Sequence, residues 1–257
     1  MSQDVKAATK GDEPPPPAPA SGASALVALE NYAGTLAQRT YLSLKDAILK
    51  LGYRPGEVLR KPEICAVLGV SRSPVAEAVA RLAAEGLVDV VPQSGTFVAR
   101  FSIDEIREGA FLREALELAA VERVAETLSD EQSVLLRRSL RLQEALIADG
   151  DIAGFYETDL QMHDLILSFT GYRRLSSMAQ TAWVHVNRAR RLFLPTPGRV
   201  DRTLEEHRAI VEALEAHDPA RARRVTRQHL AQLTAALDLM LRDNPEFFDP
   251  PREGAVS

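Results

Sequence analysis

The sequence predicts a mostly α-helical protein of two domains. The first is a winged helix-turn-helix of three helices plus a two-stranded wing, and the second is an all-α antiparallel helical bundle. Three observations lead to this fold class. The chain has 257 residues, a length that suits two domains of about 100–200 residues each. Apolar residues recur at helical spacing along most of the chain, and only residues 87–100 change to the β-rich pattern of a hairpin.

The first domain is expected over residues 31–100. Its elements are, in order, helices over 36–49 and 62–68, a helix that begins at Ser71, and strands over 87–91 and 96–100. Gly69 ends the second helix and Gly86 the third, because glycine readily adopts the left-handed conformation found after helices. Ser71 is a residue type that caps helix N-termini. The Pro-Gln-Ser-Gly run at 92–95 predicts the turn of the wing.

The second domain is expected over residues 101–243. Ser102 followed by Glu105, and Ser129 followed by Gln132, have the spacing of capping boxes that begin helices. The predicted helices run to about residue 128, then to about 150, and then over about 151–168, 173–194, 201–217 and 219–242. No strand pattern occurs here, so an antiparallel bundle of about six helices follows.

Two tails are expected at the ends of the chain. Residues 1–30 contain four consecutive prolines and many small residues, which bury too little apolar surface to offset the entropy of ordering. We therefore predict a disordered tail over 1–30. A second, flexible tail is predicted over 244–257, where prolines recur.

Composition excludes some classes of protein. No run of eighteen apolar residues occurs, so a membrane span is not expected. A single cysteine, Cys65, excludes a disulfide framework and fits the cytoplasm. The net charge is −5, yet residues 31–100 carry 9 basic and 6 acidic side chains, a local excess of +3. Because nucleic-acid binding depends on the local field, this segment remains a candidate for DNA binding.

The second helix of a helix-turn-helix enters the major groove, where its N-terminal residues contact base edges. Ser71, Arg72 and Ser73 occupy that place, and Arg72 has the fork geometry that bonds guanine O6 and N7. Phosphate or minor-groove contacts are expected from the neighbouring residues Arg60, Lys61, Gln93, Ser94, Gly95 and Thr96.

The segments 41–49, 55–59, 68–75, 85–88 and 95–98 together resemble, in order, the DNA-binding domain of GntR-type bacterial transcription regulators. The resemblance implies a double-stranded DNA operator as partner. The family usually has arginine where this chain has Ala76, and often a basic residue where it has Ser94. Since the resemblance implies DNA contacts at both positions, we expect a divergent operator or a lower affinity.

Histidines and one aspartate suggest a metal site in the bundle. Asp159 and His163 lie four residues apart, on one face of a predicted helix. His207 and His229 lie on later helices, and facing helices of a bundle can bring such groups together in the core. Three imidazoles and one carboxylate suit a divalent ion, with zinc expected first and nickel, iron or manganese as alternatives. Taken singly, each histidine also fits an ordinary surface or core position.

Residues 105–240 resemble the effector domain (FCD) of the FadR-like branch of GntR regulators. The resemblance rests on Arg113 to Glu117, the Asp159 and His163 pair, and the Glu206-His207 segment, with His229 following in family order. In metal-binding members, an aspartate and three histidines bind a divalent cation. The resemblance therefore implies Asp159, His163, His207 and His229 as metal ligands.

A small organic acid is the effector that the resemblance implies. Arg113 occupies a place that lines the pocket in relatives, where it could clamp a carboxylate. An ion pair with Glu117 one turn along the helix is the alternative role for this arginine. Arg188, Arg191 and Asn187 share a later helix and are further candidates for the same pocket, although surface positions suit these arginines too.

The sequence thus predicts a metabolite-responsive transcription regulator that is not an enzyme. We expect a homodimeric repressor that binds a pseudo-palindromic operator, with DNA affinity controlled by a carboxylate at or near the metal. Two alternatives remain: a metal-dependent helical enzyme fused to a DNA-binding lobe, and a regulator with a purely structural metal. The paired Glu-x-x-His motifs of two-metal carboxylate bundles are not present.

Overall fold

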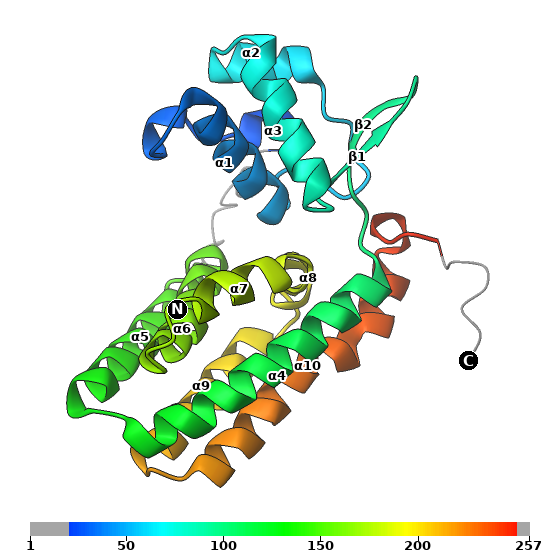
Figure 1. The fold of residues 1–257 in the computed structure, drawn as a ribbon. Helices are drawn as coiled ribbons and strands as arrows, with labels where there is room; N and C mark the ends of the chain where they lie inside the picture. The colour runs from blue at the N-terminus through cyan, green and yellow to red at the C-terminus, as the bar shows by residue number, and fades with distance from the viewer. Residues whose placement is uncertain (1–20, 251–257) are drawn as a thin grey trace, which may run out of the picture.

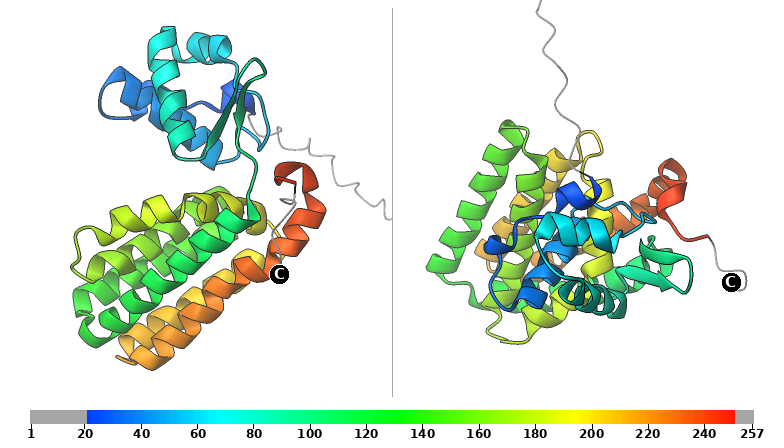
Figure 2. Two further views of the ribbon diagram at one scale, coloured as in Figure 1. Left: turned by 45° about the vertical axis from the view of Figure 1, so that its right-hand side comes forward. Right: turned by 90° about the horizontal axis from the view of Figure 1, so that it is seen from above.

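The computed structural model describes residues 21–250, which form two domains joined by the segment around Phe101 (Figure 1). The N-terminal winged helix-turn-helix lies over one end of a helical bundle, and the second strand of the wing leads directly into the first bundle helix (Figure 2). The predicted fold class is confirmed.

The winged helix-turn-helix contains α1 (Leu36–Leu49), α2 (Lys61–Leu68), α3 (Arg72–Ala84), β1 (Val88–Val91) and β2 (Gly95–Val98). The two strands are antiparallel, with Val88 opposite Val98. One pairing was not foreseen from the sequence: the segment before α2 lies along β2, where the Leu59 N–H donates to the Thr96 carbonyl at 2.8 Å. The wing is thereby tied to the start of the helix-turn-helix.

The helix ends of this domain follow from single residues. Gly69 has φ +63° at the end of α2, as its residue type predicts. Ser71 does precede α3, but its side chain makes no capping hydrogen bond. The Ser71 hydroxyl therefore remains available at the exposed start of the recognition helix, and the expected capping role is corrected.

The bundle contains α4 (Ile103–Thr127), α5 (Asp130–Ala148), α6 (Ile152–Phe169), α7 (Leu175–Ala182), α8 (Val184–Phe193), α9 (Arg199–Glu215) and α10 (Pro219–Asp243). The long helices α4 and α10 pack side by side, while α7 and α8 lie at the end nearest the winged helix (Figures 1 and 2). The sequence predicted one helix over 173–194. The structure divides it at the buried Trp183, where φ is −97° and ψ is 5°, into α7 and α8.

The two predicted capping boxes differ in the structure. Ser129 and Gln132 form both reciprocal hydrogen bonds at the start of α5. At the start of α4, Ser102 accepts from the Glu105 N–H, but the reciprocal bond is not formed. Both serines still cap their helices.

The predicted tails are too long, and the structure corrects both. Leu29 is buried beside the core of the winged helix, and the Ser43 hydroxyl donates to the Val27 carbonyl at 2.7 Å. At the other end, the Phe248 ring is buried with its centroid 5.3 Å from that of Phe101. Apolar contacts and backbone hydrogen bonds thus order residues 21–30 and 244–250. The remaining tail residues, 1–20 and 251–257, lie outside the described part of the chain.

Among the helices of residues 21–250, none is long and apolar enough to cross a membrane.

Candidate metal centre and DNA-binding surface

Three helices bring the four predicted metal ligands together. Asp159 and His163 come from α6, His207 from α9 and His229 from α10. One ligand atom from each of the four lies within 4.8 Å of the others, and all four side chains are buried. The spacing of four residues on α6 explains only half of this cluster, because the packing of α9 and α10 supplies the rest.

Each of the three imidazoles has a hydrogen-bond acceptor at its Nδ1 atom. Nδ1 of His163 lies 2.7 Å from Glu117 Oε2, and Nδ1 of His207 lies 2.7 Å from Gln143 Oε1. Nδ1 of His229 lies 2.7 Å from Glu206 Oε2. An acceptor at Nδ1 places the proton there and leaves Nε2 with a free lone pair, which is the form that binds a metal.

The Nε2 atoms turn toward one another and toward the carboxylate. Nε2 of His229 lies 3.2 Å from Nε2 of His163, and Nε2 of His207 lies 3.2 Å from Asp159 Oδ1. Neither Nε2 of His207 nor Oδ1 of Asp159 has a hydrogen-bond partner, although both are buried. Lone pairs that converge without donors form a site for a cation.

Electrostatics keep Asp159, His163 and His229 in metal-binding form. Burial alone would raise the pKa of the Asp159 carboxyl, but the Arg190 guanidinium and the neighbouring His207 and His163 outweigh it and hold that pKa well below its usual value. Burial lowers the pKa of His163, and it lowers that of His229 well below the usual value, with the other imidazoles adding to the effect. Asp159 is therefore ionised and these two imidazoles are neutral near pH 7.

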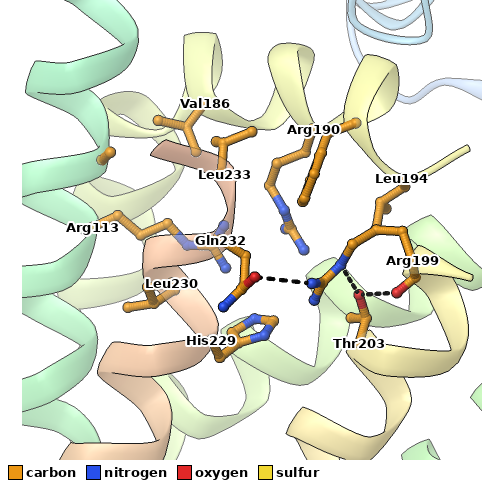
Figure 3. A pocket seen from close by; sticks show the side chains of 12 residues that line it. Arg113, Val186, Arg190, Leu194, Arg199, Thr203, His229, Leu230, Gln232 and Leu233 are labelled. Atoms are coloured by element: carbon orange, nitrogen blue, oxygen red, sulfur yellow. Dashed lines mark hydrogen bonds between the residues drawn. The ribbon is translucent and has the colours of Figure 1, made fainter. Parts of the chain in front are cut away.

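A small pocket of about 30 Å³ lies beside the cluster and includes His229 in its wall. Three buried arginines point into it, Arg113 from α4, Arg190 from α8 and Arg199 from α9 (Figure 3). Each also contacts a carboxylate, either that of Asp159 or one that lies at the Nδ1 atom of an imidazole. Arg113 Nε lies 2.6 Å from Glu117, Arg190 Nη2 lies 2.5 Å from Asp159, and Arg199 binds Glu206. Arg113 thus lines the pocket and also makes the ion pair with Glu117, while its contact with a carboxylate effector stays a prediction.

The three other candidates for this pocket are placed elsewhere, and that expectation is corrected. Arg188 is fully buried over the Phe101 ring, Arg191 binds Glu157, and Asn187 accepts a hydrogen bond from Tyr156 through its main-chain carbonyl. None of them lines the pocket beside His229.

The residues that replace them were missed in the sequence. Arg190 follows Val186 by four residues, so both lie on the apolar face of α8 that contacts the bundle. An arginine on an apolar helix stripe is the signal that could have identified it. Glu117, Gln143 and Glu206 gave no such signal, because each contacts an imidazole of another helix, 46, 64 and 23 residues away in the sequence.

The predicted DNA-contacting residues at the start of α3 lie on an open surface. Ser71, Arg72 and Ser73 are exposed, and Ala76 is exposed one turn further along. The buried residues of α3, which face the core, are Pro74, Val75, Ala78, Val79 and Leu82. This helix can therefore present its N-terminal side chains to a groove. Arg60 and Lys61 begin α2 nearby, with Arg60 exposed and 3.7 Å from Glu63.

Of the four wing residues predicted to contact DNA, three are exposed and Thr96 is buried. Gln93 and Ser94 are exposed in the turn, where Gln93 has φ +63° and Gly95 has φ +142°. Thr96 was expected to meet DNA, but its side chain is only 6% exposed. Since side chains alternate between the faces of a strand, Thr96 points into the domain together with Val98, two residues on.

A winged helix-turn-helix with an exposed third helix, joined to a helical bundle with a buried cluster of candidate metal ligands, is the architecture of a DNA-binding regulator. Residues 36–98 match the gntR family of bacterial regulatory proteins, and residues 108–232 match the FCD domain. The chain belongs to the GntR family of bacterial transcription regulators and carries an FCD effector domain. Family and relatives make it a transcription regulator rather than an enzyme.

Two relatives and one solved structure show the extent of the similarity. An HTH-type transcriptional regulator from an unstable DNA locus of Streptomyces ambofaciens is 33% identical over 208 residues, which cover 81% of this chain and 87% of that protein. The HTH-type transcriptional repressor RspR of Escherichia coli K12 is 28% identical over 82% of this chain and 92% of its own length. The crystal structure of a GntR transcriptional regulator from Rhodococcus sp. RHA1 has a TM-score of 0.68 at 26% identity, covering 78% of this chain and 98% of that one.

Proposed function

We propose that this regulator is a homodimeric, cytoplasmic repressor whose affinity for a pseudo-palindromic operator is controlled by a small carboxylate bound at or near a divalent metal. The observation that carries the proposal is a set of buried, unpartnered atoms of two kinds in one place. Asp159 Oδ1 and His207 Nε2 offer lone pairs without donors, while Arg113 Nη2 and Arg190 Nη1 offer N–H groups without acceptors. Buried polar groups are normally satisfied. A cation fits the first pair and an anion fits the second.

The ligand set favours zinc, with nickel, iron or manganese as alternatives. Three imidazole nitrogens and one carboxylate oxygen are donors that these ions accept. The acceptors behind each imidazole, Glu117, Gln143 and Glu206, supply the outer contacts that such sites usually have. A bound divalent ion supplies the positive charge that draws a carboxylate into the pocket.

The metal assignment is tested by removing two ligands from different helices. The double variant His207→Ala, His229→Ala should lose stoichiometric divalent metal, measured by elemental analysis of purified protein. A matched control is His185→Ala, His217→Ala, which removes two histidines outside the cluster and should keep its metal. Full metal content in the first variant contradicts the assignment.

The effector is tested with the metal-loaded protein. A thermal-shift screen of small mono- and dicarboxylates should find ligands that raise the unfolding temperature, because a ligand of the folded state stabilises it by RT ln(1 + [L]/Kd). Arg190→Met should abolish the shift, whereas Arg191→Met should not, since Arg191 lies outside the pocket. If chelation lowers stability but no carboxylate changes operator affinity, the metal is structural only.

The operator and the dimer form one further part of the proposal. Two recognition helices related by a two-fold axis contact half-sites about one helical turn apart in simple cases. Repression is favoured because the Escherichia coli transcriptional repressor RspR aligns with most of this chain. Light scattering of the protein with its operator should show two chains on one DNA duplex. One chain per duplex at saturation would rule the dimer out.

A further inference from the structure

A cavity of about 450 Å³ lies between the two domains. Helices α1 and α3 form its wall on the winged helix, while α7 and the start of α8 form its wall at the end of the bundle that faces the winged helix (Figure 1). The pocket beside the metal cluster is much smaller, at about 30 Å³. Because ligand sites are cavities of roughly 300–1,000 Å³ that occur preferentially at domain interfaces, this cavity has the size and the position of a ligand site.

Two pairs of side chains form the wall on the winged helix. Tyr41 and Lys45 lie one turn apart on α1. Arg81 and Glu85 have the same spacing at the C-terminal end of α3. The Tyr41 hydroxyl donates to Glu85 Oε1 at 2.6 Å, and Lys45 Nζ donates to Glu85 Oε2 at 2.7 Å and to the Tyr41 oxygen at 2.9 Å. The packing of α1 against α3 thus joins the two pairs into one polar wall.

Arg81 is held flat against this wall. Its guanidinium carbon lies 3.7 Å from the centroid of the Tyr41 ring, and its Nε lies 3.7 Å from Glu85 Oε1. These contacts use one face and one edge of the guanidinium, so its Nη atoms have no acceptor within residues 21–250. A planar guanidinium that is stacked on a ring and keeps free N–H groups is prepared to bind a carboxylate or a phosphate through two parallel hydrogen bonds.

The charged groups of this wall leave a net positive charge in the cavity. Lys45 and Arg81 are cationic, and Glu85 is the one acidic residue that lines the cavity. Burial alone would raise the pKa of Glu85, but its hydrogen bonds with Lys45 and Tyr41 outweigh burial and lower that pKa. Glu85 is therefore ionised near pH 7, and it neutralises only one of the two cations. One of the three N–H groups of the Lys45 ammonium also remains for a further acceptor.

The wall on the bundle is polar but neutral. Helix α7 contains no charged residue, and its exposed residues Ser177 and Gln180 line the cavity. Val184, at the start of α8, adds an apolar contact next to them. The bundle therefore does not neutralise the positive charge of the opposite wall, and it places a hydroxyl and an amide across the cavity from Arg81.

We propose that this cavity binds a small organic anion that contacts both domains. The carboxylate or phosphate of the ligand binds the Nη atoms of Arg81 and the third N–H of Lys45, and its polar body hydrogen-bonds to Gln180 on α7. No described residue lines both this cavity and the pocket beside His229. The inference therefore goes beyond the proposed function and does not rest on the metal or its effector.

Calorimetric titration of the full-length protein with inorganic phosphate and, separately, with acetate tests the anion site and distinguishes its two possible anionic groups. We expect one of them to bind and Arg81→Gln to raise its Kd by at least about tenfold, the usual effect of losing a charged hydrogen bond. The control Arg107→Gln removes an exposed arginine of α4 outside the cavity and should keep the wild-type Kd. Binding of neither probe overturns the proposal. A Kd that Arg81→Gln leaves unchanged indicates an adventitious ion only and overturns it too.

Substitutions at Ala84 test the charge of the cavity without touching its hydrogen bonds. Ala84 is exposed and lines the cavity, so a longer side chain there leaves the core of the domain intact. Ala84→Glu and Ala84→Gln add a similar volume, but only Glu adds a negative charge beside the bound anion. Ala84→Glu should bind the probe at least about threefold more weakly than Ala84→Gln. Equal Kd values in these two variants overturn the proposal.

Glycerol 3-phosphate and glycerate test the contact with the bundle, because they add hydroxyl groups to the two anionic probes. The one that carries the preferred anionic group should bind about threefold more tightly than its parent probe, the worth of one hydrogen bond, and Gln180→Leu should remove that difference. Equal affinities of the wild-type protein for parent and derivative overturn the contact with α7.

Arg190→Met separates this site from the proposed effector site. Arg190 lines the pocket beside the metal cluster, so this variant should keep the binding that Arg81→Gln weakens. If Arg190→Met abolishes the binding of the probe and Arg81→Gln does not, the anion lies in the pocket beside the cluster and the present proposal is overturned. The opposite pattern supports the cavity between the domains, whatever the metal analysis shows.

Discussion

A substitution at Gln143 tests whether the hydrogen-bond acceptors at Nδ1 of the imidazoles affect metal affinity. Its side chain is 0% exposed, and its Oε1 lies 2.7 Å from His207 Nδ1. The change Gln143→Leu keeps a similar volume and alters no charge, but it removes the acceptor that fixes the His207 tautomer. We expect metal affinity to fall by about 10–100-fold, the usual effect of losing such an outer contact.

The consequence for stability can be calculated. With free metal at about 1,000 times the wild-type Kd, binding stabilises the folded state by about 4.1 kcal/mol. After a 10–100-fold loss of affinity, the same metal concentration contributes only about 2.7–1.4 kcal/mol. For a domain of this size, 1 kcal/mol corresponds to about 2–4 °C. The metal-induced rise in unfolding temperature should therefore shrink by roughly 3–11 °C.

The assay is a competition titration with a chromophoric zinc chelator, together with thermal unfolding of metal-free and metal-loaded protein. Gln232→Leu is the matched control, because Gln232 lines the same pocket and accepts from Arg199 rather than from an imidazole. It should keep the wild-type affinity. An unchanged zinc affinity in Gln143→Leu would refute the reasoning that Nδ1 contacts prepare this site.

Three more predictions concern the DNA surface, the metal-free cluster and the C-terminal segment. Arg72→Ala should cost roughly 1–3 kcal/mol at one base pair of the operator, as measured by binding to a set of single-base variants; uniform weakening would instead make Arg72 a phosphate contact. The metal-free protein should lose stability as pH falls below the usual histidine pKa of 6.5, because the unfolded chain then takes up protons and the buried His163 and His229 of the folded chain do not. The free energy of unfolding should fall by up to about 1.4 kcal/mol per pH unit for each histidine. A free energy of urea unfolding that is constant from pH 7 to 5.5 would contradict this. Phe248→Ala should destabilise the protein by about 3–5 kcal/mol, since a buried ring is removed. The control Phe111→Ala, at an exposed ring, should change the stability little. Equal unfolding temperatures of the two variants would mean that the C-terminal segment does not contribute to the stability of the fold.

Local signals in the sequence predicted most helices and the wing, because their causes lie within a few residues. Gly69 ends α2 through its own backbone freedom, and Ser129 with Gln132 closes a capping box within one turn. Local composition gave a wrong prediction where tertiary contacts determine the structure. Residues 244–250 have the composition of a tail, yet Phe248 packs on Phe101, far away in the sequence.

The candidate site shows the same division. The sequence by itself determined the DNA-binding domain, the family resemblance and the four metal-ligand candidates, because residue type and order carry that information. Only the tertiary structure decided that Arg190, rather than Arg188 or Arg191, lines the pocket. Only the tertiary structure also showed that Gln143 and Glu206 contact the Nδ1 atoms of imidazoles on other helices. The physical reason is that these contacts depend on the relative rotation and packing of whole helices, and no short spacing in the chain encodes such a rotation.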